Sequence, residues 1–168
     1  VQPPQQRSFM SSSLTIVSYR DELLPALVEA WNRAFQGRRN FMRMTPALFR
    51  SRVSGKSNAV EAFDPAGFFI ALESGDIAGF AHAGVRSETV CRVVYGESSS
   101  GMSEGYIAIL HVDPARRRRG IGAALWDAAT AYLHGSGRIV IDGQCLNPFY
   151  GNSEGPQTPL WGTSEGPA

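Results

Sequence analysis

A short apolar strand, a basic turn and a helix follow one another between Tyr106 and Gly137, and this stretch constrains the fold more than any other. Asp113-Pro114 ends the strand, because proline cannot donate to a β-ladder. The turn that follows, from Arg116 to Gly122, is rich in arginine and glycine. Gly135 is placed where a left-handed residue would end the helix. Between the turn and Gly135 the spacing predicts an amphipathic helix, with an apolar stripe of Ile121, Ala124, Leu125, Ala128 and Tyr132.

The start of this helix predicts an anion-binding site. The first N–H groups of a helix have no intrahelical partner, and the helix dipole makes that end positive. Gly120 and Gly122 would let a bulky anion approach the backbone closely, because no Cβ stands in the way. Together these features indicate a cradle for a diphosphate.

The same residues allow other interpretations of the turn. A run of four arginines is more often a solvated face or a nucleic-acid patch when no glycines accompany it. A Rossmann turn is excluded because Leu125 stands where its third glycine would be. A Walker phosphate loop is excluded because the only lysine, Lys56, lies elsewhere.

The pattern Arg117-x-x-Gly120-x-Gly122, preceded by a strand that ends in Asp113-Pro114, resembles the acetyl-CoA signature of the GCN5-related N-acetyltransferase (GNAT) superfamily. The resemblance implies an α/β fold with a mixed, mostly antiparallel central sheet flanked by helices. It also implies that backbone amides of the turn hold the pyrophosphate of acetyl-CoA, while the strand pairs with its pantetheine arm. The cofactor-binding residues so implied are Leu110, His111, Val112, Arg117, Arg118, Arg119, Gly120, Ile121, Gly122 and Ala123.

Length and composition predict one globular domain. The chain has 168 residues, of which 43% are hydrophobic and 18% charged, so it can bury a single core. A net charge of +1 gives no argument for a nucleic-acid or membrane partner. Cys91 and Cys145 lack metal or redox spacing and are expected to be free thiols, so we predict no metal. Without a long apolar run or a signal-peptide pattern, we expect a cytoplasmic protein.

Three segments are expected along the chain: a disordered arm at residues 1–13, an acyl-CoA N-acetyltransferase domain at 14–142, and a Gly/Pro-rich loop or tail at 143–168. Asp21 and Thr45 are expected as helix N-caps. The remaining elements are a strand at Leu14–Arg20, helices ending near Gly37 and Gly55, a hairpin of Phe68–Glu73 and Ile77–Val85 joined by Ser74-Gly75-Asp76, and a strand at Arg138–Asp142.

After Gly143 the pattern no longer matches the resemblance. The family continues with a helix and two strands, and often with a tyrosine that protonates the leaving thiolate. None of these is legible here, so we expect the chain to be the amino-terminal part of a longer protein that lacks them. A homodimer partner or a missing C-terminal domain would then cover the sheet edge.

Candidate catalytic residues come from the resemblance and from position. The amide of Val112 would polarise the thioester carbonyl. Glu104 is a candidate base, two residues before Tyr106 and on the same strand face by a period of two. His111, on the opposite face, is the other candidate, since imidazole accepts protons near neutral pH. Tyr150 is the candidate acid.

Each of these candidates also has an ordinary structural role. Glu104 could be a solvated loop acid and His111 a packed strand residue. Trp31 and Phe35 are expected in the core, and His82 is expected to be an ordinary strand histidine with a satisfied hydrogen bond. For each of them a place along the acceptor cleft is the alternative.

Three functions follow from these observations. The first is transfer of an acetyl group from acetyl-CoA to the amine of a small-molecule or peptide acceptor, whose identity the sequence does not reveal. The second is a catalytically silent acyl-CoA-binding domain. The third, an arginine-rich nucleic-acid binder, is disfavoured by the near-zero net charge.

Overall fold

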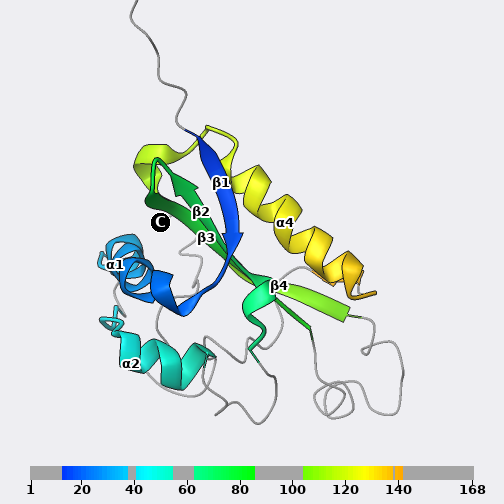
Figure 1. Ribbon diagram of the computed structural model, residues 1–168, viewed down its shortest axis with the longest axis horizontal. Helices are drawn as coiled ribbons and strands as arrows, with labels where there is room; N and C mark the ends of the chain where they lie inside the picture. Colours follow the sequence, from blue (N-terminus) through cyan, green and yellow to red (C-terminus); the bar gives the residue numbers. More distant parts are fainter. Residues whose placement is uncertain (1–12, 38–40, 55–62, 86–103, 138, 142–168) are drawn as a thin grey trace, which may run out of the picture.

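A computed structural model describes residues 13–37, 41–54, 63–85, 104–137 and 139–141 (Figure 1). Within these residues a single five-stranded sheet has the order β1-β2-β3-β4-β5. The first four strands pair antiparallel with their neighbours, whereas β5 runs parallel to β4. The predicted α/β class and mostly antiparallel sheet are therefore confirmed. The strands are β1 (Leu14–Ser18), β2 (Phe68–Glu73), β3 (Asp76–Val85), β4 (Glu104–Val112) and β5 (Ile139–Ile141).

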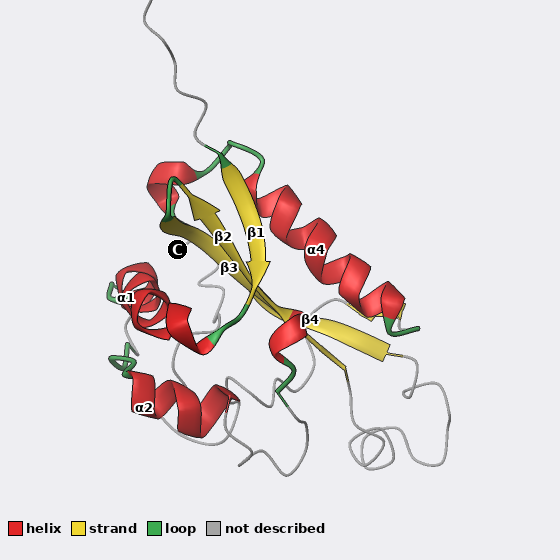
Figure 2. Ribbon diagram, in the orientation of Figure 1, coloured by secondary structure: helices red, strands yellow, loops and turns green. Residues whose placement is uncertain are grey.

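Helices cover both faces of this sheet (Figure 2). One face carries α1 (Leu24–Phe35), which follows the 3₁₀ turn η1 (Asp21–Leu23), and α2 (Pro46–Phe49), which continues into the π-helical η2 (Arg50–Ser54). The opposite face carries α4 (Ile121–Gly135). Aromatic side chains dominate the core under α1: Trp31, Phe49, Phe68, Phe80 and Tyr106. Smaller residues dominate the core under α4: Ala71, Ala78, Ala81, Ala83, Ile121, Leu125, Ala129 and Leu133.

Two of the expected helix ends differ from the sequence prediction. Asp21 does not cap a helix, because its carboxylate accepts the Tyr19 hydroxyl at 2.6 Å and pairs with Arg50 at 3.3 Å. Burial, reinforced by this carboxylate, raises the pKa of Tyr19 to about 12. Gly135 is still helical, and Gly137, with φ of 69°, is the left-handed residue beyond the helix end.

The second expected N-cap and the hairpin are confirmed. The Thr45 hydroxyl accepts the Leu48 N–H at 3.1 Å, with proline at the first helical position. Between β2 and β3 the two turn residues Ser74 and Gly75 have φ of 55° and 90°. Such positive values suit a two-residue hairpin turn, because its twist matches that of the strands.

A β-bulge interrupts β4 at Ala108. His82 pairs with Ile109 and Ala83 with Ile107, so the register between the two strands shifts by one residue at Ala108. The extra residue resets the alternation of side chains. Tyr106 belongs to the core under α1, and the His111 ring lies 5.4 Å from Phe35 of that same core. The strict period of two, which put His111 on the face opposite Tyr106, was therefore wrong.

Several expectations concern residues that lie outside the described ones. These are the arm at 1–13 (except Ser13), the tail at 143–168, Tyr150 and both cysteines, so the domain boundaries stay predictions. None of the described helices combines the length and hydropathy that a membrane crossing requires. A cytoplasmic location stays a prediction.

Candidate functional site

A groove of about 320 Å³ opens between the end of β4 and the start of α4. On this side of β4, the register with β5 extends only over Glu104, Gly105 and Tyr106. From Ile107 onward, the described part of β5 therefore leaves the β4 edge uncovered. Six of the ten predicted cofactor-binding residues gather along the groove: Leu110, His111, Val112, Arg117, Arg118 and Gly122.

The backbone between β4 and α4 is held in a defined shape. Asp113 starts the 3₁₀ turn η5 (Pro114–Arg116), because its carboxylate accepts the Ala115 N–H at 2.9 Å. Arg118 and Gly120 both have positive φ, 60° and 82°. A glycine at the N-cap of α4 suits this conformation, which costs other residues free energy.

The open end of α4 presents amides rather than side chains. Gly120 is its N-cap and supplies no capping side chain, and the Ala124 N–H bonds the Gly120 carbonyl at 3.0 Å. The amides of Ile121, Gly122 and Ala123 therefore precede this helical bond and emerge from the positive end of the dipole. A Cβ on Gly120 would meet nothing within 4 Å, so space for an anion lies beside it.

The four arginines of the turn divide into two pairs. Arg117 and Arg118 line the groove, and the Arg117 Nε donates to the Val112 carbonyl at 3.1 Å. Arg116 and Arg119 instead bind Glu73 at the end of β2. Arg119, expected among the cofactor residues, can therefore offer a cofactor its backbone but not a freely placed side chain. No pattern of residue types predicts this role of Glu73.

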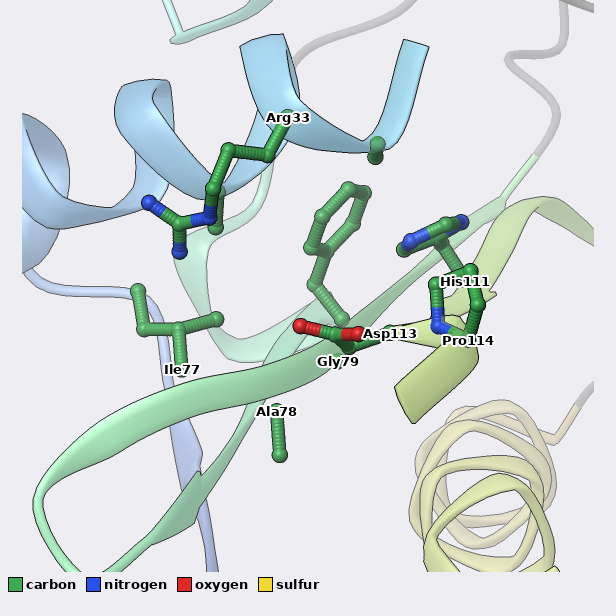
Figure 3. Close-up of a pocket in the computed structure, with 10 residues that line it drawn as sticks. Arg33, Ile77, Ala78, Gly79, His111, Asp113 and Pro114 are labelled. Carbon is green, nitrogen blue, oxygen red and sulfur yellow. The ribbon is translucent and has the colours of Figure 1, made fainter. Parts of the chain in front are cut away.

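His111 lines two cavities at once. Besides the groove, it borders a smaller cavity of about 50 Å³ between α1 and the ends of β3 and β4. Figure 3 shows His111, Asp113 and Pro114 on one side of this cavity, with Arg33 and Ile77 on the other. The imidazole packs 5.4 Å from Phe80, so it is both a packed strand residue and a neighbour of open space.

Glu104 and His111 stand at opposite ends of β4. They are seven positions apart, which corresponds to roughly 23 Å of extended strand. The Glu104 backbone pairs with Ile139 where β5 still covers β4. The structure therefore does not bring the two candidate bases together, and the third candidate, Tyr150, lies outside the described residues.

The residues that could have lined an acceptor cleft are instead core residues. Trp31, Phe35 and His82 are 0%, 5% and 1% exposed. Loss of hydration in this site lowers the pKa of His82 to about 3, although the Asp64 charge opposes the shift. The expectation that Trp31 and Phe35 belong to the core is confirmed, and His82 is a buried residue of β3.

Asn32 is a structural residue that the sequence prediction missed. Its side chain donates to the Met44 carbonyl at 2.9 Å and accepts the Met44 N–H at 2.8 Å. These buried bonds hold the end of the α1–α2 connection against α1. A buried asparagine within an apolar helix stripe was the available signal, because a buried amide needs partners.

Comparisons with known proteins agree with this architecture. The sequence model of the acetyltransferase (GNAT) family matches residues 21–147. The chain is 30% identical over 134 residues to the mycothiol acetyltransferase of Propionibacterium freudenreichii subsp. shermanii, covering 79% of this chain and 38% of the relative. It therefore spans well under half the length of that relative.

Solved acetyltransferases share the fold at low sequence identity. Aminoglycoside N-acetyltransferase AAC(6′)-Iy, solved with CoA, has a TM-score of 0.55 and 19% identity, covering 80% of this chain and 78% of its own. Aminoglycoside acetyltransferase meta-AAC0020, from an uncultured soil metagenomic sample and solved with sisomicin, has a TM-score of 0.53 and 21% identity, covering 77% and 76%. An N-acetyltransferase from Staphylococcus aureus Mu50 has a TM-score of 0.54 and 17% identity, covering 78% and 73%.

These similarities show the fold, and the family match adds the sequence signature over most of the chain. The match to the family model extends from the start of η1 to beyond β5. The matched residues therefore include the turn and the other residues that line the groove. The chain belongs to the acetyltransferase (GNAT) family.

Proposed function

We propose that this protein is an N-acetyltransferase that moves an acetyl group from acetyl-CoA to the amine of a small-molecule acceptor. The observation that carries the proposal is the groove at the start of α4, where six residues of the predicted signature gather. Two acetyltransferases with this fold are named for aminoglycosides, and the relative of similar sequence is named for mycothiol. These names support a small-molecule acceptor over a peptide.

The residues present fit acetyl-CoA. The amides at the start of α4 and the positive-φ residues Arg118 and Gly120 form a concave, electropositive surface for a pyrophosphate. Arg117 and Arg118 supply positive charge along the same groove. The edge of β4 that β5 leaves uncovered can accept the amide groups of the pantetheine arm as an added strand.

Once bound, acetyl-CoA supplies an activated acyl thioester. The chain must then accept a proton from the acceptor's ammonium group, so that the free amine can attack the thioester, and stabilise charge on the carbonyl oxygen. We propose His111 as the proton acceptor, directly or through a water molecule, because it borders both the groove and the neighbouring cavity. The Val112 amide is proposed for the carbonyl oxygen, with Glu104 as the alternative base and Tyr150 as the acid.

Binding of acetyl-CoA is tested first, by thermal shift. A ligand at a hundred times its Kd stabilises a folded protein by about 2.7 kcal/mol, so wild type should show a clear rise in Tm. Gly120→Glu should abolish the rise, because it puts a carboxylate where the pyrophosphate is expected. Gly137→Glu is the matched control: it has the same charge and a similar positive φ at the other end of α4. An oligonucleotide should produce no shift.

Catalysis is tested separately, by detecting free thiol released from acetyl-CoA over a library of small amines. Turnover with any amine supports the transferase. Binding without turnover across the library would instead support the silent acyl-CoA-binding domain. No shift in wild type with acetyl-CoA would overturn both readings.

A further inference from the structure

Two arginines of the proposed phosphate turn, Arg116 and Arg119, contact the β2–β3 hairpin on the side of the turn away from the groove. Figure 1 places the turn after β4 beside the tip of this hairpin. Glu73 is the last residue of β2, and its side chain is only 10% exposed. Arg116 and Arg119 reach it from the two ends of the arginine run.

The contacts to Glu73 involve both of its carboxylate oxygens. Arg119 Nη1 lies 3.1 Å from Oε1 and 3.2 Å from Oε2. Arg116 Nη1 lies 3.4 Å from Oε2 and 3.3 Å from the Glu73 carbonyl oxygen. Its other nitrogen, Nη2, lies 3.1 Å from Asp76 Oδ2 across the hairpin. A nearly buried carboxylate needs such partners, because an unpaired charge away from water is strongly unfavourable.

This arrangement constrains the residues in between. Arg117 and Arg118, which line the groove, lie between two side chains anchored at one point. Arg118 has a φ of 60°, a sparsely populated conformation for a residue with a Cβ, and surrounding contacts must hold it there. The contacts of Arg116 and Arg119 with Glu73, one on each side of this pair, supply that restraint.

The same contacts divide the charge of the turn. Glu73 engages Arg116 and Arg119 behind the turn, so the positive charge directed into the groove comes from Arg117 and Arg118. The negative charge of Glu73 lies behind the turn, where two guanidinium groups neutralise it. A phosphate in the groove is therefore not exposed to a bare carboxylate.

We propose that Glu73 is a positioning residue for the phosphate turn: through Arg116 and Arg119 it holds the turn in the shape that directs its amides and Arg118 toward the pyrophosphate of acetyl-CoA. The inference rests on the proposed function. Glu73 itself contacts no substrate in this scheme. Glu73 strengthens the binding of the cofactor and keeps the backbone of the turn well ordered.

The experiment uses the full chain and CoA itself, with Kd measured by calorimetry at 0.15 M salt, roughly physiological ionic strength. Glu73→Gln should raise the Kd on the order of tenfold, as expected for the loss of a charge-assisted hydrogen bond. Arg119→Gln should do the same, and the double variant should be little worse than either, because the two residues act through one contact. Arg119→Lys should restore most of the affinity. Asp127→Asn, which removes an exposed carboxylate of α4, is the matched control and should bind like wild type.

Amide hydrogen exchange without ligand provides the second readout. In Glu73→Gln, peptides covering residues 113–123 should exchange faster, while peptides from α1 should be unchanged. If Glu73→Gln does not fold, Arg119→Gln carries the test, because that side chain is 56% exposed. Unchanged exchange and unchanged Kd would overturn the proposal, and so would tighter CoA binding by the freed arginines. If wild type fails to bind CoA, the proposed function is wrong, and the ligand-free exchange still decides whether Glu73 shapes the turn.

Discussion

At the scale of single residues, His111 is the side chain whose position has the clearest chemical consequence. It packs against Phe35 and Phe80 and also borders both cavities. A base that takes up the ammonium proton typically contributes 10² to 10⁴ in rate. Its removal should therefore act on turnover more than on cofactor binding.

We expect His111→Asn to lower kcat by about 10²-fold or more, the range of general-base catalysis, with little change in the Kd for CoA. In this variant, the decrease of the rate toward acidic pH should also disappear. Stopped assays of thiol release between pH 5.5 and 9 measure both effects. Glu104→Gln is the parallel variant: if it removes this decrease and His111→Asn does not, the base is Glu104.

His82 makes a different kind of prediction, about stability. Its pKa is about 3 in the folded protein, because burial disfavours the charged ring, and the unfolded chain has the ordinary value of 6.5. Between these values the unfolded state binds a proton that the folded state does not. Stability should therefore fall as the pH drops below 6.5 toward 3, by up to about 1.4 kcal/mol per pH unit.

Urea unfolding at pH 7, 6, 5 and 4 measures this dependence. His82→Gln should be less stable at pH 7, since a packed ring among Phe63 and Phe68 is lost, but its stability should fall less steeply below pH 6.5. Equal slopes for both proteins would show that other groups cause the acid sensitivity.

At the scale of elements, the small residues of β3 decide how closely α4 and β4 approach it. A Cβ on Gly79 would lie 2.6 Å from the His111 carbonyl oxygen and 3.1 Å from the Leu125 side chain. The His111 carbonyl oxygen is a backbone atom, so it can move away only if β4 itself moves. Glycine at position 79 is therefore a packing requirement of the sheet and of α4.

Gly79→Ala should destabilise the fold by about 1–3 kcal/mol, the usual cost of overpacking. Gly135→Ala is the matched control, because Gly135 is helical and a Cβ there would meet nothing within 4 Å. That change should stabilise by roughly 0.5–1 kcal/mol, since alanine loses less backbone entropy in a helix. Denaturant unfolding of both variants tests the pair, and a neutral Gly79→Ala would contradict the packing argument.

The β-bulge of β4 is the element that joins fold to site. By adding one residue at Ala108 it turns Tyr106 and His111 toward the same core. Bulges re-aim side chains beside functional sites in many proteins. A continuous apolar strand carries no sequence signal for a bulge, because the register could shift at any residue of the run.

At the scale of the whole molecule, the sheet separates two environments that meet at the end of β4. The aromatic core under α1 and α2 lies on one face, and the alanine-rich contact with α4 lies on the other. The start of α4, the open edge of β4 and the cavity beside α1 come together where the strand ends. In many α/β folds, ligands bind at such strand ends, where several elements contribute residues.

Membership of the acetyltransferase family indicates the fold and the class of cofactor, but it does not identify the acceptor. Function depends on sites placed on a fold, and acceptor choice depends on loops that vary independently of it. The chain spans 38% of the length of its mycothiol acetyltransferase relative, so a partner domain or a second copy that covers the sheet edge stays a prediction.

Local chemistry determined what could be predicted from the sequence alone. The spacing of glycines, arginines and Asp113-Pro114 predicted the strand, turn and helix around the groove, because each of these depends on neighbouring residues. Thr45 and the Ser74-Gly75 turn were predictable for the same reason. The resemblance to the family rested on this local pattern and is confirmed.

Contacts between residues distant in sequence were decided only by the tertiary structure. Glu73 meets Arg116 and Arg119, more than forty positions away, because the hairpin folds back beside the turn. The Ala108 bulge depends on how β3 pairs with β4. Asp21 lies within a 3₁₀ turn, and its carboxylate accepts the Tyr19 hydroxyl instead of capping a helix. Side-chain pairing across the sheet depends on register and distance, which a linear pattern of residue types does not contain.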